Sequence, residues 1–522
     1  MKLKWLYSES DLELSEQILV NRKRDKSEYN QRLDSLPDEN LFADMKIATE
    51  RILQALYSNE KIVIFGHDDP DGVTATFLLY DFFDSSGFQN HYSYIPNRLI
   101  DHHGIQDNFV TYLKELKADL VITVDNGISS KEKVEEIKAL GIDVIITDHH
   151  IFEQENIPLA TAVVNPKRQD CPYPYDMLAG VGVSLMLVRS LAKSLNKKVK
   201  PSYYFWTAVG SLADRVPMTG VNWVIVRHVL EAWDDISDNT INMLKSICNP
   251  ILNDYDKMNF LTYCYRMIAN GRDSEGQHHG LLFMLSNDKA KYDEFSLIQT
   301  EKKANELNIF GLNTIIGEIL ASYAGEGVIY YDEDNRIPNS LLGTCATFLV
   351  NSLYEPVIML KQREDIIICE GRCSDGFSIL DAFKYCEEAL IQYGGHVRAG
   401  GFTMQKDNLE RFKVLYREYF QQQKQQIDDY KLINVDAVID VAEFNNEIWE
   451  HLDFMLPFGH GNSEPTILVK NYDNQAENSP IVIENSVKYH LDTNKNYDLI
   501  LQMNNNGQTK VIDYRETDES SN

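Results

Sequence analysis

Strand-like runs alternate with segments of helical periodicity through the first third of the chain. The runs have the length of buried strands and lie at residues 62–65, 91–95, 119–124, 143–147 and 161–164. The intervening spacing predicts helices at residues 76–83, 107–117 and 130–140. Strands separated by helices of this length form a parallel sheet with helices on both faces, so the sequence predicts an α/β fold for this region.

The chain ahead of the first strand has two parts. Residues 1–45 carry mixed charge, and we expect the basic cluster at residues 21–26 to be a solvated helix face and not a docking patch. Residues 40–58 show helical periodicity, with Leu53 at the margin of an apolar face formed by Leu41, Met45, Ala48, Ile52 and Leu56.

The remaining two thirds divide into regions of different pattern. Residues 225–320 look mostly helical, residues 325–425 mix strands and helices, and the last ninety or so are strand-like and aromatic. A small β-barrel of OB type is expected there, followed by an acidic tail from Glu516 to Asn522. The predicted boundaries are 1–45 for the arm, 46–235 for the parallel-sheet domain, 236–322 for a helical connector, 323–425 for a second α/β domain and 426–522 for the OB-like domain.

Composition is that of a soluble globular protein of several domains. Of the 522 residues, 43% are hydrophobic and 25% charged, and the longest apolar runs are too short for a transmembrane helix. The N-terminus turns acidic before a signal-peptide core could form. Seven cysteines lack the paired spacing of metal fingers and are expected to be reduced, which fits a cytoplasmic protein.

Carboxylates and imidazoles follow three of the predicted strands directly. Asp-rich turns and loop histidines are common by themselves, but three such endings in one sheet point to a shared site at the carboxyl edge. Asp214, which follows another apolar stretch, could close this site. The strand-end residues are His67, Asp69, Asp71, Asp125, His149 and His150.

This ligand set predicts a two-ion centre. Four or five carboxylates with one or two histidines are too many for one tetrahedral zinc, and they suit two ions that hold an attacking water and a leaving oxygen. Mixed oxygen and imidazole ligation favours Mn²⁺, with Mg²⁺ as the other choice. Phosphoester hydrolysis is the predicted reaction class.

The motifs resemble those of the DHH phosphoesterases and, within them, the RecJ-like single-strand exonucleases. The resemblance spans roughly residues 38–470 and rests on the motifs HDDPDG (67–72), PNR (96–98), VDNGIS (124–129), TDHH (147–150), NPK (165–167), LAGVGV (178–183), LADRVP (212–217), GGHVRAGG (394–401) and PFGHGNSEP (457–465). It implies a DHH catalytic domain, a DHH-associated substrate-binding domain and a C-terminal OB-like domain.

The resemblance also implies residue roles. It makes Asp69, Asp71, Asp125, His149 and Asp214 metal ligands, with His67 as a variable sixth and His150 beside the metals as a ligand or a donor to phosphate. Asp125, His149 and His150 are the implied catalytic residues. The implied substrate-binding residues are Arg98, Arg272, Arg372, Gly394, Gly395 and His396.

Some positions depart from the family pattern. Val73 stands where small-substrate DHH enzymes usually carry an Asp, which favours the RecJ branch. The segment after PNR reads Asp101-His102-His103-Gly104-Ile105 without the usual tyrosine, and IPNSLLGT (337–344) lacks the usual histidine. We expect nucleic-acid contacts to be altered there while the metal centre stays intact.

The activity implied is exonucleolytic hydrolysis of single-stranded DNA from a free end, 5′ to 3′, in DNA repair or recombination. A single-strand-binding protein or a helicase is an expected partner, and no membrane is. The alternatives are a small-substrate DHH phosphodiesterase acting on nanoRNA or cyclic dinucleotides, and an inactive replication scaffold. A net charge of −29 opposes nucleic-acid binding, so any basic channel must be local, and the motifs suggest Arg98, Arg272, Arg372 and Arg398 as its lining.

Overall fold

The computed structural model describes the chain as two compact units. One comprises Ser8–Gln299 with Val435–Asn522, and the other Met1–Tyr7 with Thr300–Asn434. The residues described are 4–97, 104–248, 250–269, 276–286, 309–323, 327–374, 376–395, 397–429, 432–473, 495–503 and 509–517. No helix among these residues is long and apolar enough to span a membrane.

A five-stranded parallel sheet forms the centre of the first unit, with strand order β3-β2-β4-β5-β6. Its strands are β2 (Ile62–Phe65), β3 (His91–Tyr94), β4 (Leu120–Val124), β5 (Asp143–Thr147) and β6 (Ala162–Val164). Alternate residues enter two cores: Ile62 and Ile64 pack with the helices on one face, Val63 and Phe65 with those on the other. The predicted fold class is therefore confirmed.

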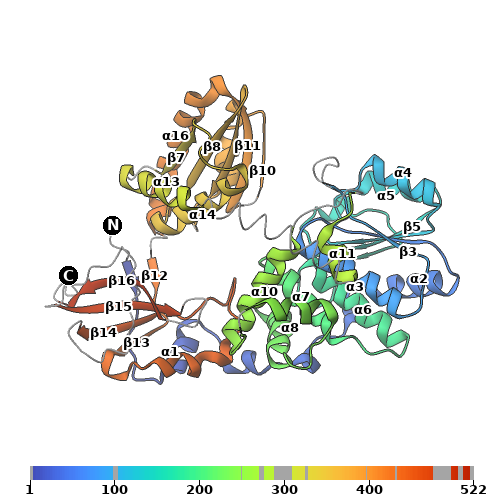
Figure 1. The fold of residues 1–522 in the computed structure, drawn as a ribbon, viewed down its shortest axis with the longest axis horizontal. Coiled ribbons are helices and arrows are strands. Elements are labelled where there is room, and N and C mark those ends of the chain that lie inside the picture. Colours follow the sequence, from blue (N-terminus) through green and yellow to red (C-terminus); the bar gives the residue numbers. More distant parts are fainter. Residues whose placement is uncertain are drawn as a thin grey trace. The chain divides into compact units, whose positions relative to one another are not determined.

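Helices cover both faces of this sheet, as Figure 1 shows. One face carries α2 (Met45–Tyr57), α3 (Pro70–Ser85) and α6 (Gly180–Ser194), and the other carries α4 (Asp107–Leu116) and α5 (Lys131–Ala139). Further helices of the unit are α1 (Leu14–Asn21), α7 (Pro201–Ala213), α8 (Gly220–Glu231), α9 (Asn239–Ile247), α10 (Asp254–Ile268) and α11 (His279–Leu285).

Two sequence expectations near the sheet are corrected. Helix α3 begins at Pro70, not at residue 76, because Asp69 caps it and proline at the first position needs no backbone donor. The acidic motif therefore lies at a helix start and not in a loop. Leu41 is 41% exposed in a short 3₁₀ turn, whereas Met45, Ala48 and Ile52 of the expected face are buried.

The C-terminal region adds a four-stranded sheet to the first unit, consistent with the expected small β domain. Its order is β13-β14-β15-β16, with one parallel and two antiparallel pairings. The strands are β13 (Ala437–Asp440), β14 (Ile467–Asp473), β15 (Asn496–Met503) and β16 (Thr509–Glu516), with the 3₁₀ segment η9 (Asn446–Met455) between the first two.

The N-terminal arm docks on this C-terminal region, so the expectation of a solvated basic cluster was wrong. Nε and Nη2 of Arg22 donate to the two carboxylate oxygens of Asp436 over 2.8 and 2.7 Å, and Arg22 also reaches the carbonyl oxygens of Ser463 and Glu464. Both side chains are only 13% exposed. Sequence alone offered no sign of this pairing because its partners are 414 residues apart.

The second unit is built on a five-stranded mixed sheet of order β10-β11-β9-β8-β7. Its strands are β7 (Val328–Asp332), β8 (Val357–Arg363), β9 (Ile366–Arg372), β10 (Gln392–Gly395) and β11 (Ala399–Gln405). Its helices are α13 (Ile309–Ser322), α14 (Leu342–Leu353), α15 (Ile379–Tyr385) and α16 (Leu409–Asp429). A short parallel pair, β1 (Lys4–Leu6) with β12 (Leu432–Asn434), completes it.

Candidate metal centre

The carboxyl ends of three neighbouring strands bring the predicted ligands together. Strands β2, β4 and β5 are adjacent in the sheet, and their ends lead into His67, Asp125 and His149 respectively. The chain then returns from β2 into α3, which places Asp69 at the cap and Asp71 in the first turn of that helix.

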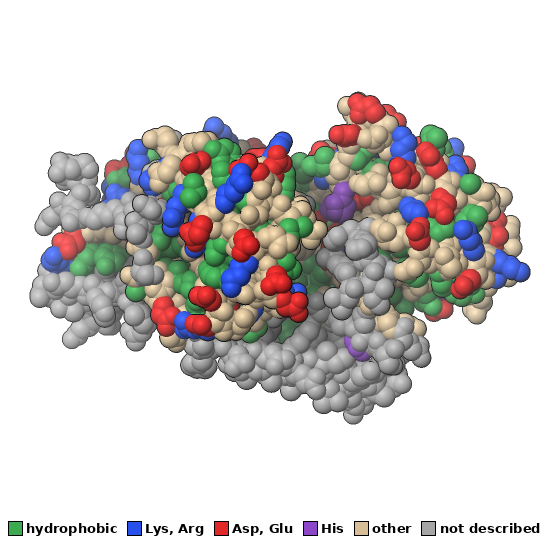
Figure 2. Space-filling model, turned by 90° about the horizontal axis from the view of Figure 1, so that it is seen from above, with side chains coloured by type: hydrophobic (Ala, Val, Ile, Leu, Met, Phe, Trp, Pro, Cys, Tyr) green, Lys and Arg blue, Asp and Glu red, His purple; other side chains and the backbone are tan. Residues whose placement is uncertain are grey.

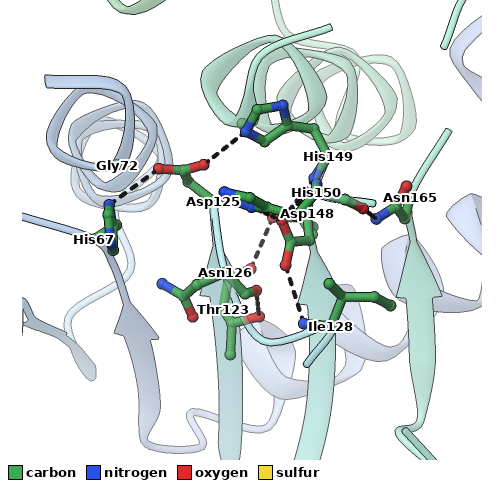
Figure 3. A network of polar contacts seen from close by, with 12 residues as sticks. His67, Gly72, Thr123, Asp125, Asn126, Ile128, Asp148, His149, His150 and Asn165 are labelled. Atoms are coloured by element: carbon green, nitrogen blue, oxygen red, sulfur yellow. Dashed lines mark hydrogen bonds and ion pairs between the residues drawn. The ribbon is translucent and has the colours of Figure 1, made fainter. Parts of the chain in front are cut away.

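Asp125 lies between two imidazole rings (Figure 3). Its Oδ2 is 3.6 Å from Nδ1 of His67 and its Oδ1 is 3.1 Å from Nε2 of His149. The residue is 1% exposed, its backbone is left-handed with φ +58°, and Oδ1 accepts no hydrogen bond from the described residues. Oδ1 and the facing ring nitrogen of His149 are both metal-ligand atoms, and a cation shared by them would give this buried oxygen a partner.

Asp71 is fixed by a helix far from it in sequence. Its two carboxylate oxygens accept hydrogen bonds, each of 2.7 Å, from the backbone N–H groups of Gly180 and Val181 at the start of α6. The positive end of that helix favours the anion. Gly180 is needed there because a Cβ at this position would lie 2.4 Å from Cβ of Asp125.

Asp214 caps the C-terminal end of α7, and its side chain is 31% exposed. Nε2 of His149 lies 3.8 Å from an oxygen of Asp214 and 3.8 Å from an oxygen of Asp71. The apolar stretch that precedes Asp214 is thus a helix that ends at the site, and Asp214 closes the cluster as expected.

His150 is held by its neighbour Asp148. Nδ1 of His150 is 2.7 Å from Oδ1 of Asp148, while the backbone N–H groups of Ile128, His149 and His150 donate to the same carboxylate. Asp148 is 1% exposed. The sequence interpretation assigned Asp148 no role; its place in TDHH was the available signal.

Burial and mutual repulsion set the charges of the cluster. Burial, then the charge of Asp214, raises the pKa of Asp71 to about 7. Burial, followed by Asp69, raises the pKa of Asp214 to about 6, and burial with Asp71 raises the pKa of Asp125 well above its ordinary value. Burial lowers the pKa of His149, which keeps its ring neutral and able to ligate. The raised pKa values of the three carboxyl groups reflect crowded, buried negative charge, which bound cations would offset.

The donor set fits two divalent cations. Three groups of side chains each bring their ligand atoms within 4.8 Å of one another: Asp125 with His149 and His150, His67 with Asp69 and Asp125, and Asp71 with His149 and Asp214. Asp125 and His149 each belong to two groups, as bridging or shared ligands would. Oxygen and imidazole donors in this number suit Mn²⁺ or Mg²⁺ better than a single zinc.

Two residues of the NPK motif also border the centre, and sequence interpretation assigned them no role. Asn165 Nδ2 donates to the carbonyl oxygen of His150 over 3.1 Å, and Asn165 Oδ1 accepts from the backbone N–H of Lys167 over 2.8 Å. The ammonium of Lys167 is partly buried, and burial lowers its pKa against the opposing charges of Asp176, Asp214 and Asp148. A cation is thus held beside the metal cluster.

The predicted substrate residues of the second unit that the structure describes, Arg372, Gly394 and Gly395, lie at the same end of strands β9 and β10, with β11 between them. Arg372 pairs in register with Ala399, and Gly395 with Gly400. Nη1 of Arg372 donates to Glu370 over 2.9 Å, and Gly395 has φ +137°, where a Cβ would meet backbone at 2.4 Å. Gly394 lines a pocket of about 520 Å³.

Three predicted substrate residues, Arg98, Arg272 and His396, lie outside the described residues.

Known proteins share both sequence and fold with this chain. Residues 61–210 match the model of the DHH family, N-terminal domain. The chain is 29% identical to the single-stranded-DNA-specific exonuclease RecJ of Bacillus subtilis (strain 168), over 82% of this chain and 54% of that protein. It is 27% identical to the RecJ exonuclease of Dickeya dadantii (strain 3937), over 76% of this chain and 72% of that protein. The chain thus spans about half the length of the Bacillus relative.

Two solved structures share its fold. RecJ from Thermus thermophilus in complex with Mn²⁺ superposes with a TM-score of 0.74 at 20% identity, covering 98% of this chain and 79% of that one. An exonuclease RecJ bound to manganese gives a TM-score of 0.60 at 23% identity, covering 74% of this chain and 98% of that one.

Proposed function

We propose that this chain is a RecJ-like member of the DHH family and a metal-dependent exonuclease that hydrolyses single-stranded DNA from a free end. The observation that carries the proposal is a cluster of six side chains whose ligand atoms suit two ions. These side chains are His67, Asp69, Asp71, Asp125, His149 and Asp214. The relatives' names supply the substrate class, since both are single-stranded-DNA-specific exonucleases.

The chemistry divides between the cations and the protein. Two divalent ions, when bound, supply the activated water and the charge that a phosphodiester needs for hydrolysis. The six clustered side chains would hold them. Asp148 orients His150, and the half-exposed ring would donate a proton to a phosphate oxygen or to the leaving oxygen. Lys167 would add a fixed positive charge for the phosphate.

The second unit would contribute phosphate contacts through Arg372, Gly394, Gly395 and His396, with Arg98 and Arg272 as further cations. The negative net charge is compatible with this role if the favourable field is confined to the site. On the face drawn in Figure 2, acidic and basic side chains are interspersed. The 5′ to 3′ polarity, the place in DNA repair or recombination, the cytoplasmic location and a single-strand-binding or helicase partner rest on the resemblance to RecJ proteins.

The alternatives are less well supported. An inactive scaffold has no need of the candidate ligands, all of which are present and clustered. If the chain were a small-substrate phosphodiesterase, this would not explain why 82% of it aligns with a RecJ exonuclease.

The experiment compares four substrates under one metal and salt condition: a linear single strand labelled at either end, a closed single-stranded circle, a blunt duplex and a dinucleotide. We expect Mn²⁺-dependent release of mononucleotides from the 5′-end of the linear strand and no cutting of the circle. Asp125→Ala should abolish activity. Efficient cutting of the circle, or preference for the dinucleotide, would contradict the proposal.

A further inference from the structure

The segment that follows Asp214 is held by hydrogen bonds at Pro217, Met218 and Thr219. Asp214 caps α7 with its backbone N–H bonded to the carbonyl oxygen of Gly210, Arg215 has φ +58°, and α8 begins at Gly220, so a short connection holds the carboxylate on its C-terminal side. Within it, the carbonyl oxygen of Pro217 accepts from Tyr175 and Asn222 over 3.2 and 3.0 Å.

The contact at Met218 comes from a turn of the C-terminal region, formed by residues 457–464. The backbone N–H of Met218 donates to the carbonyl oxygen of His460 over 2.6 Å. Met218 is 1% exposed, and a Cβ at Gly459 would lie 3.2 Å from its Cβ and Cγ. The turn and the connection therefore pack closely against each other, although Met218 and His460 are 242 positions apart in sequence.

Asn462 holds this turn in shape. Its Nδ2 donates to the carbonyl oxygens of Met455 and Pro457 over 2.8 and 2.9 Å, and its Oδ1 accepts from the hydroxyl of Tyr29 over 3.2 Å. Its backbone also exchanges two hydrogen bonds with Gly459. The residue is 4% exposed, so an alanine would leave buried polar groups without partners.

The geometry points to Asn462 as a positioning residue for Asp214: the turn that it shapes fixes Met218, and Met218 fixes the connection on which the carboxylate depends. The C-terminal region would thereby take part in metal binding although none of its described residues belongs to the candidate ligand groups. This inference rests on the proposed function, since it requires Asp214 to bind a metal.

A double-mutant cycle on the full chain, read out as Mn²⁺ affinity by electron paramagnetic resonance of the free ion, tests it. We expect Asn462→Ala to weaken Mn²⁺ binding about tenfold, the lower end of the effect of removing an outer-shell partner. Because it acts through Asp214, it should add nothing to Asp214→Asn. Gly459→Ala, which displaces Met218 and spares the hydrogen bonds of Asn462, should weaken Mn²⁺ binding in the same way if Asn462→Ala fails to fold.

Asn408→Ala is the matched control. It also removes a side-chain amide donated to a backbone carbonyl, that of Ala389, but in the other unit, and should leave Mn²⁺ affinity unchanged. Unchanged Mn²⁺ affinity in Asn462→Ala, or additive losses in the double variant, would overturn the inference alone. Unchanged affinity in Asp214→Asn would instead overturn the metal assignment, and the inference with it.

Discussion

Asp148 holds His150 through a contact of 2.7 Å between Oδ1 and Nδ1, and it is itself fixed by three backbone N–H groups. The hydrogen bond to Asp148 raises the pKa of His150, while the hydrogen bond from His150 and the backbone donors keep the pKa of Asp148 low despite its burial. A buried, ionised acid thus orients a half-exposed imidazole at the edge of the metal cluster.

Asp148→Asn should therefore reduce DNA hydrolysis about 10- to 100-fold, the usual cost of losing an outer-shell partner. The pKa of His150 should fall in the metal-free protein, because its anionic partner is gone, and NMR titration of the histidine ring measures this. An unchanged rate together with an unchanged His150 pKa would show that this contact does not matter.

Gly180→Ala should disrupt the metal centre by a steric clash with the side chain of Asp125. The added methyl would lie 2.4 Å from Cβ and 2.6 Å from Oδ1 of Asp125, so the carboxylate must move. We expect at least a tenfold loss of Mn²⁺ affinity in calorimetry. Gly317→Ala is the control, because its methyl meets nothing within 4 Å in α13 and should stabilise the helix by about 0.5–1 kcal/mol.

In the metal-free protein, the contribution of the Asp71 carboxyl group to the free energy of unfolding should fall as pH rises. A carboxyl whose pKa is about 7 when folded and 3.8 in its ordinary state binds more protons folded than unfolded, so its contribution falls between about pH 4 and pH 7. In urea unfolding, the difference in stability between Asp71→Asn and wild type should grow in favour of the variant across this window. Mn²⁺ should remove the difference by stabilising the wild type, and a pH-independent difference would contradict the assignment.

Arg22→Ala should destabilise the first unit by about 3 kcal/mol, because it leaves the carboxylate of Asp436, which is only 13% exposed, without its cation. Lys46→Ala is the matched comparison: its pair with Glu50 is 3.9 Å long, with side chains 82% and 66% exposed, and should contribute less than about 0.5 kcal/mol. Urea unfolding of both variants measures the contrast, and equal losses would show that the arm is not docked in solution.

Arg372→Ala should weaken binding of single-stranded DNA and leave Mn²⁺ content unchanged, since we propose that this side chain contacts phosphate and not a metal ion. Filter binding and metal analysis on the same protein preparation decide it. Loss of bound metal in Arg372→Ala would contradict the proposal that this side chain contacts phosphate and not a metal ion.

The parallel sheet and the chemical character of its carboxyl edge could be predicted from the sequence. Strand runs of four or five apolar residues and the acids and imidazoles directly after them are local features, and parallel strands necessarily bring their carboxyl ends to one edge. The proximity of His67, Asp125 and His149 could therefore be predicted from the sequence.

Tertiary structure decided what orients those residues. The contact of Asp71 with the start of α6, the docking of Arg22 on Asp436 and the hydrogen bond from Met218 to His460 join segments 109, 414 and 242 positions apart. Periodicity reports which side of an element is buried, but not which distant segment covers it. For the same reason the exposure of Leu41 and the role of Asp148 emerged only from the folded chain, where packing and hydrogen-bond partners are fixed by the whole fold.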